Sequence, residues 1–179
     1  MDDNSRRQRI RVLKKSSPNG NITVYLGKQD FVDHLTHVDP IGGVILMNPD
    51  DLNNKKVFGK VLPAFRYGCN DPDVVGSTLR KDLCFTTNQI YPPRDEMPAR
   101  TPTRFQELLL KKLGANAHPF YFEFPLKCPA SATLLSAIRD PGKLRGVDYE
   151  FRVYVAETAG EKQQKSFTTM AKEIGFVVE

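Results

Sequence analysis

The side chains that could carry out acid–base or metal chemistry are few, and they do not form a recognised catalytic pattern. The histidines are His34, His37 and His118, and nothing beside them marks a nucleophile with a matched base. There is no glycine-rich dinucleotide or phosphate loop, and Asp71 and Asp73 lack the spacing of a calcium-binding loop. We therefore predict a protein that is not an enzyme and that binds neither a cofactor nor a metal ion.

The cysteines give no reason to expect a disulfide or a zinc site. Cys69, Cys84 and Cys128 are three in number, so they cannot all pair within one chain. None of them belongs to a C-x-x-C pair, the spacing typical of zinc and redox sites. We predict reduced thiols, as in a protein of a reducing compartment.

Basic residues outnumber acidic ones, with a formal net charge of +5 and an isoelectric point near 9.1. This balance favours an anionic partner, and charge alone leaves phosphorylated protein, acidic lipid and nucleic acid open. The basic residues stand in scattered pairs without interleaved aromatic side chains, at Lys14-Lys15, Lys55-Lys56, Arg80-Lys81 and Lys111-Lys112. Such scatter is not typical of nucleic-acid binding, so no nucleic-acid partner is predicted.

Two of the charged sites have alternative interpretations that the residues alone leave open. Adjacent strand residues point to opposite faces, so at least one ammonium of Lys14 and Lys15 either stays hydrated or meets an anion. Asp30 precedes the apolar pair Phe31 and Val32, and it is either a solvated turn acid or a partly buried partner of a cation.

Chain length and hydropathy limit the architecture and the compartment. The 179 residues suit one domain with a two-layer core. No apolar run approaches the roughly 20 residues needed to cross a bilayer, and the arginine-rich start lacks the apolar segment of a secretory signal. We predict a soluble cytoplasmic protein with a flexible basic tail over residues 1–9 and a folded domain over residues 10–179.

Short segments in which apolar and polar residues alternate, separated by turn residues, predict strands. These segments are residues 10–14, 22–26, 44–47, 57–65, 79–87, 120–124 and 147–155. The apolar run at 44–47 is expected to be buried on both faces, and the other strands to have polar faces towards water. The pattern predicts an all-β fold, an antiparallel, immunoglobulin-like β-sandwich.

One short amphipathic helix is predicted between Thr103 and Leu113. Phe105, Leu109 and Leu113 recur at helical spacing, Thr103 can cap the amino end, and Gly114 stands where a C′ glycine belongs. We expect this helix to lie on the sandwich. Near the carboxyl end, residues 168–178 alternate in a way that permits a strand, which Gly175 weakens.

The sequence also resembles the arrestin family in its amino-terminal domain. Similar segments occur in family order and cover roughly residues 10–157, namely residues 12–20, 24–34, 64–68, 79–83, 109–114 and 146–151. The resemblance implies the arrestin amino-terminal β-sandwich, which performs no chemistry of its own. It further implies binding to phosphorylated, activated seven-helix receptors, with desensitisation and scaffolding as the result.

Several site residues follow from the resemblance. It implies that Lys14 and Lys15 meet receptor phosphates, with Arg11 and Lys112 lining the same basic groove. Several charge-assisted contacts are the physical means of recognising a phosphorylated tail, because each phosphate brings nearly two negative charges and several acceptors.

Three further groups are implied by the resemblance alone. The loop at residues 67–75 is similar to the finger loop that enters an active receptor, with its tip at Asp73, Val74 and Val75. Asp30 matches one acid of the polar core, a buried charge cluster that phosphate entry breaks. The apolar contacts that join the first strand, the helix and the family's carboxy-terminal tail match Val12, Leu13, Phe105, Leu109 and Leu113.

The sequence departs from the family pattern in places. Gln29 stands where arginine is usual, Pro72 and Ser77 replace apolar finger-loop residues, and no arginine follows Arg152. The resemblance decays after about residue 158, and the carboxy-terminal arrestin domain and its tail are expected to lie outside these 179 residues. An uncovered groove with exposed apolar surface would allow self-association.

The predicted partners follow from the same resemblance. They are a phosphorylated seven-helix receptor, a photoreceptor opsin among the candidates, and inositol phosphates or an anionic membrane surface. The predicted location is the cytoplasm, with recruitment to the inner face of the plasma or photoreceptor membrane. An alternative is a membrane-trafficking adaptor of the wider arrestin-like group, although the sequence has no proline-tyrosine recruiting motif.

Overall fold

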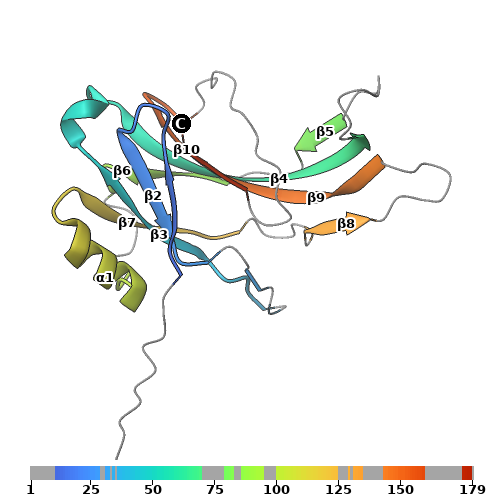
Figure 1. Ribbon diagram of the computed structural model, residues 1–179, viewed down its shortest axis with the longest axis horizontal. Helices are drawn as coiled ribbons and strands as arrows, with labels where there is room; N and C mark the ends of the chain where they lie inside the picture. Colours follow the sequence, from blue (N-terminus) through green and yellow to red (C-terminus); the bar gives the residue numbers. More distant parts are fainter. Residues whose placement is uncertain are drawn as a thin grey trace, which may run out of the picture.

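Two β-sheets face each other and enclose the main apolar core in the computed structural model (Figure 1). The structure describes residues 11–28, 31–32, 34, 36–69, 79–82, 86–94, 100–124, 129, 131–134, 143–159 and 175–178. The smaller sheet has the order β1-β2-β3-β7, and each pair in it is antiparallel. Its strands are β1 (Leu13–Ser16), β2 (Ile22–Leu26), β3 (Ile41–Met47) and β7 (Ala117–Phe122).

The larger sheet is built on the long antiparallel pair β4 (Lys56–Cys69) and β9 (Lys143–Ala156). β5 (Leu79–Asp82) and β6 (Thr86–Tyr91) both pair with β4, and β8 (Ala132–Leu134) pairs with β9. β10 (Gly175–Val178) also joins β9, in the one parallel pairing among the described strands. A short 3-10 helix, η1 (Pro49–Leu52), links β3 to β4.

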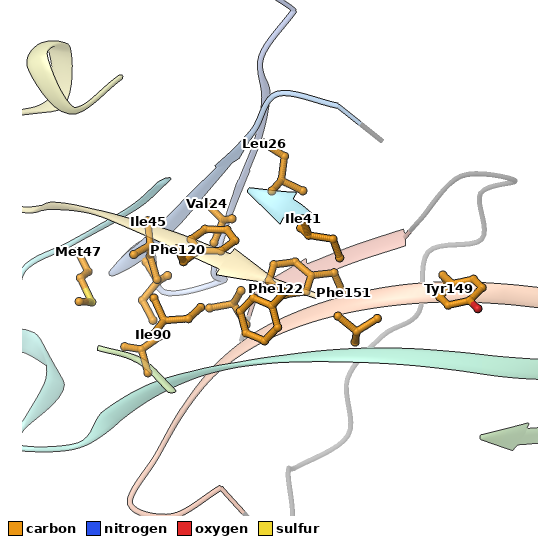
Figure 2. Packing of buried hydrophobic residues seen from close by; sticks show 14 of the residues in the cluster. Val24, Leu26, Ile41, Ile45, Met47, Ile90, Phe120, Phe122, Tyr149 and Phe151 are labelled. Atoms are coloured by element: carbon orange, nitrogen blue, oxygen red, sulfur yellow. The ribbon is translucent and has the colours of Figure 1, made fainter. Parts of the chain in front are cut away.

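Aromatic rings fill the space between the sheets. Phe120 and Phe122 of β7 meet Phe151 of β9, with ring centroids 5.6 and 5.1 Å apart (Figure 2). Ile41 and Ile45 of β3 lie in the same cluster. Burying a side chain of this kind contributes about 1.5–3 kcal/mol, so the period-2 alternation of these strands decides which faces meet.

β3 is buried on both faces, as the apolar run at residues 44–47 predicted. Ile45 belongs to the core between the sheets, whereas Val44 belongs to a second cluster on the outer face. That cluster is covered by α1 (Arg104–Leu113), which lies on β3 and β7 (Figure 1). The helix predicted on the sandwich is therefore confirmed, as is the sandwich itself.

The ends of α1 form as the local signals predicted. Thr103 is the N-cap, and its side chain and that of Gln106 make the reciprocal hydrogen bonds of a capping box. At the other end Gly114 has φ 85°, a conformation that favours glycine, and its N–H donates to the carbonyl of Leu110.

The larger sheet differs from the sequence predictions in two respects. The single strand predicted at residues 79–87 is divided into β5 and β6, with residues 83–85 outside the described part. Two of the polar positions of β9 do not face water, since Glu150 and Tyr154 are 4% and 3% exposed. Within the described part of the chain, no helix is long and apolar enough to span a bilayer.

His118 of β7 gives the fold a pH dependence. Its ring lies 4.8 Å from that of Tyr91, and its Nε2 is buried without a hydrogen-bond partner among the described residues. Burial lowers the pKa of His118 from 6.5, because desolvation disfavours the imidazolium. The unfolded chain therefore binds more protons below about pH 6.5, and the stability present above that pH is lost as the pH falls through the folded pKa.

We expect the melting temperature to fall between pH 7.5 and pH 5.5 by less in a His118→Phe variant than in the original chain. Phenylalanine keeps a ring against Tyr91 and removes the titrating group. Thermal unfolding followed by circular dichroism at both pH values measures this. An equal fall in both proteins would contradict the assignment to His118.

Candidate functional site

β1 presents Lys14 and Lys15 to opposite faces of the smaller sheet. Lys15 lies across from Val24, which is buried between the sheets, and Lys14 lies across from Tyr25. Directly opposed residues of an antiparallel pair share a face, so Lys14 is on the outer face and Lys15 on the inner face. Lys14 is exposed, whereas Lys15 is half-buried and already interacts with another group.

Lys14 lies on the face of the sheet that carries α1. Its Nζ is 5.9 Å from the centroid of the Tyr25 ring, and Tyr25 packs against the cluster formed by Val44, Leu109 and Ala117. A cation–π contact at an exposed site contributes about 0.5–1 kcal/mol. Tyr25 thus links the strand that carries Lys14 to the apolar cluster beneath the helix.

The two supporting cations predicted for this surface are both exposed. Arg11 precedes β1, and Lys112 is in the last turn of α1, where a cation is favoured by the helix dipole. The structure therefore places Lys112 on the same outer face as Lys14. Lys15 points to the other face, so the adjacent lysines do not form one side-by-side pair.

The predicted apolar contact between strand and helix is divided between two clusters. Phe105 and Leu113 pack with Leu109 in the cluster beneath α1, whereas Leu13 packs against the core between the sheets. Val12 is 42% exposed. Among the described residues, Phe105 is where α1 comes close to the end of β2. A Cβ added to Gly27, the residue after β2, would lie 3.3 Å from the Phe105 ring.

Some predicted site residues lie outside the described residues. These are Asp30, the predicted polar-core acid, and the predicted finger-loop tip at Asp73, Val74 and Val75. β4 extends through Cys69, so the first residues of the predicted loop, at 67–69, belong to a strand.

Two buried polar groups were missed by the sequence analysis. Gln106 is 0% exposed, and its Nε2 donates to the carbonyls of Gly43 and Phe120 at 2.9 and 3.2 Å. It fixes α1 on β3 and β7. Arg152 donates from Nε to Oε1 of Glu150 at 2.6 Å, forming a largely buried ion pair on the outer face of the larger sheet. Each group had a signal in the sequence. For Gln106 it was the capping-box spacing from Thr103, and for the ion pair it was the two-residue spacing of Glu150 and Arg152 on one strand.

The fold is a mostly antiparallel β-sandwich with one helix on the outer face of its smaller sheet. The family model described as "Arrestin (or S-antigen), N-terminal domain" matches residues 22–175. That match covers most of the chain, so the chain belongs to the arrestin family. The family predicted from the ordered segments is thereby confirmed.

Curated relatives and a solved structure agree with this family. Beta-arrestin-2 of Rattus norvegicus is 54% identical over 155 residues, which are 87% of this chain and 38% of that protein. Arrestin red cell isoform 2 of Oncorhynchus mykiss is 54% identical over the same shares of the two chains. The crystal structure of squid arrestin is similar with a TM-score of 0.68 and 35% identity, covering 94% of this chain and 53% of that one. The chain thus spans 38% of the length of these curated relatives.

Proposed function

We propose that this chain binds phosphorylated, activated seven-helix receptors and contributes to their desensitisation and to signalling scaffolds. The proposal rests on membership of the arrestin family together with one observation, the exposed Lys14 ammonium held over Tyr25 on the helix-bearing face. The proposed place of action is the cytoplasm, at the inner face of the plasma or photoreceptor membrane.

The outer face of the smaller sheet suits a phosphorylated tail. Lys14 and Lys112 supply cations on this face, and Arg11 supplies another beside β1. A phosphate group carries close to two negative charges at neutral pH and has several acceptor oxygens, so a tail with several phosphates can engage these cations together. In this proposal Lys15 contributes to phosphate binding from the inner face of β1, the first strand in the order of the smaller sheet. The loop tip at Asp73, Val74 and Val75 engages the receptor cavity.

We expect a multiply phosphorylated receptor-tail peptide to bind the chain more tightly than the plain peptide. A Lys14→Ala, Lys15→Ala double variant should lose roughly tenfold or more of this difference, since charge-assisted bonds contribute about 1.5–3 kcal/mol before screening at an exposed site reduces them. Raising the salt concentration from 0.1 M to 1 M should weaken binding strongly, because the Debye length falls from about 10 Å to about 3 Å. Isothermal titration calorimetry measures both effects.

The matched control is the Lys55→Ala, Lys56→Ala double variant. It removes the same charge from two exposed residues at the start of β4, in the other sheet. The proposal requires this control to keep most of the preference for the phosphorylated peptide. Equal affinities for the two peptides, or equal losses in the two double variants, would refute a specific phosphate site at Lys14 and Lys15.

A further inference from the structure

Three potential metal ligands lie close together among the described residues between β2 and β3. The backbone N–H of His34 donates to the carbonyl of His37 at 2.9 Å, which closes a tight turn. The N–H of Asp39 donates to the carbonyl of Val32 at 3.0 Å, which brings the two sides of the segment together. As a result, the ligand atoms of His34, His37 and Asp39 all lie within 4.8 Å of one another.

Two of these atoms already have the separation of ligands that share one metal ion. His34 Nε2 lies 3.1 Å from Asp39 Oδ1, at hydrogen-bond distance, and an ion that binds both atoms would release to solvent the proton that now joins them. Ligands at zinc distances of about 2.0–2.1 Å in a tetrahedron are about 3.3 Å apart. The imidazole of His37 is stacked on that of His34, with ring centroids 4.7 Å apart and planes inclined by 21°. Its nitrogen therefore has to approach by at most about 1.5 Å for all three to meet one ion.

The carboxylate of Asp39 is prepared to act as a ligand. An aspartate side chain is ionised at neutral pH, and this one lies 23% exposed beside Lys28 and His34. Lys28 Nζ contacts Oδ2 at 2.5 Å, while Oδ1 faces His34. The two oxygens thus have different partners, and Lys28 can keep its bond while Oδ1 takes an ion, as an outer partner that orients a ligand.

The two imidazoles have suitable nitrogens and room to move. The Thr36 hydroxyl lies 3.0 Å from His37 Nδ1, so Thr36 is a hydrogen-bond partner that can orient this ring. His34 and His37 are exposed, and the His34 side chain is 45% exposed, so an ion can reach them and His37 can turn without disturbing the core. The rotation of the His37 side chain would break its stacking contact with the His34 ring.

We propose that His34, His37 and Asp39 form a binding site for one divalent transition-metal ion, Zn²⁺ in particular, on the segment between β2 and β3. Two imidazole nitrogens and one carboxylate oxygen are donors that suit Zn²⁺, and three protein ligands leave a fourth position for water. No metal ion was predicted from the sequence, because neither cysteine spacing nor a calcium-loop pattern marks these three residues. None of the three ligands is among the residues of the proposed phosphate-binding face.

The test is a titration of the 179-residue chain with Zn²⁺ at pH 7.5 by isothermal titration calorimetry, in a reductant that does not bind metal. We expect one ion per chain. The His34→Ala, His37→Ala and Asp39→Asn variants should each bind at least about tenfold more weakly, since loss of even an outer-shell partner costs 10–100-fold. His118→Phe is the matched control, because it removes a histidine remote from the site and should bind normally.

A second measurement identifies the donor atoms. Co²⁺ substituted for Zn²⁺ should give visible absorption without the thiolate-to-metal charge-transfer band that Cys69, Cys84 or Cys128 would produce. Phosphopeptide affinity should be the same in the His37→Ala variant as in the original chain, which separates this proposal from the proposed function. The proposal is overturned by no saturable binding, by unchanged affinity in the three variants, or by a thiolate band.

Discussion

A Gly43→Ala variant is expected to lose about 3 kcal/mol of the free energy of unfolding, near the upper end for overpacking a core. A Cβ at Gly43 would lie 2.5 Å from the backbone carbonyl oxygen of Tyr25 and 2.6 Å from the ring of Phe120. The Tyr25 carbonyl belongs to β2, the neighbouring strand of the sheet, so it cannot move aside as a flexible side chain would. Relief of the clash requires β2 and β3 to separate, which would disturb their hydrogen bonds.

The adjacent glycine provides the control. A Cβ at Gly42 would point to the opposite face of β3 and would approach the ring of Tyr121 no closer than 3.4 Å, an ordinary contact. We expect Gly42→Ala to stay within about 0.5 kcal/mol of the original chain or to stabilise it slightly, because alanine reduces the entropy of the unfolded chain. Urea unfolding followed by circular dichroism gives both values. Equal losses in the two variants would show that space at Gly43 is not what limits this strand.

These two glycines illustrate what the sequence could and could not predict about the fold. Helix α1 was predicted almost to the residue, because Thr103 and Gly114 act through neighbouring backbone groups. The predicted strand began at residue 44, yet β3 begins at Ile41 and runs through Gly42 and Gly43. Glycine is required there by the approach of β2 and of the Phe120 ring, which are contacts between segments distant in sequence.

The candidate site shows the same division. Alternation correctly indicated that Lys14 and Lys15 point to opposite faces, since it is a local property of a strand. The face that carries the helix depends on the order of the strands in the sheet. That order is set by contacts between distant segments, so local sequence patterns do not predict it. Likewise, His34, His37 and Asp39 come together only because two backbone hydrogen bonds fold their segment back.

A Gln106→Glu variant is expected to lose several kcal/mol of stability at pH 7, although it changes the size of one side chain very little. Gln106 is 0% exposed, and its Nε2 donates to the carbonyls of Gly43 and Phe120, while its Oε1 accepts from the N–H of Thr103 at 3.0 Å. A carboxylate at this position would place a negative oxygen against two carbonyl oxygens, at a position closed to bulk solvent. Leaving a buried charge without a partner costs about 3–5 kcal/mol.

The loss should depend on pH with a definite sign. Burial against carbonyl oxygens raises the pKa of the introduced carboxyl in the folded chain above its usual value of about 4.3, because only the protonated form can donate to them. The variant is therefore expected to be closest to the original chain below about pH 4.3, and its deficit should grow as the pH rises through the folded pKa. The free energy of unfolding is measured by urea unfolding at pH 4 and pH 7 for the variant and for the original chain. The difference between the two proteins at each pH cancels the contributions of His118 and Asp39.

Glu107→Gln is the matched control, since this exposed neighbour on α1 undergoes the reverse exchange of acid and amide and should show little difference at either pH. A deficit in the Gln106→Glu variant that is equal at the two pH values would mean that lost packing, and not the buried charge, is the cause.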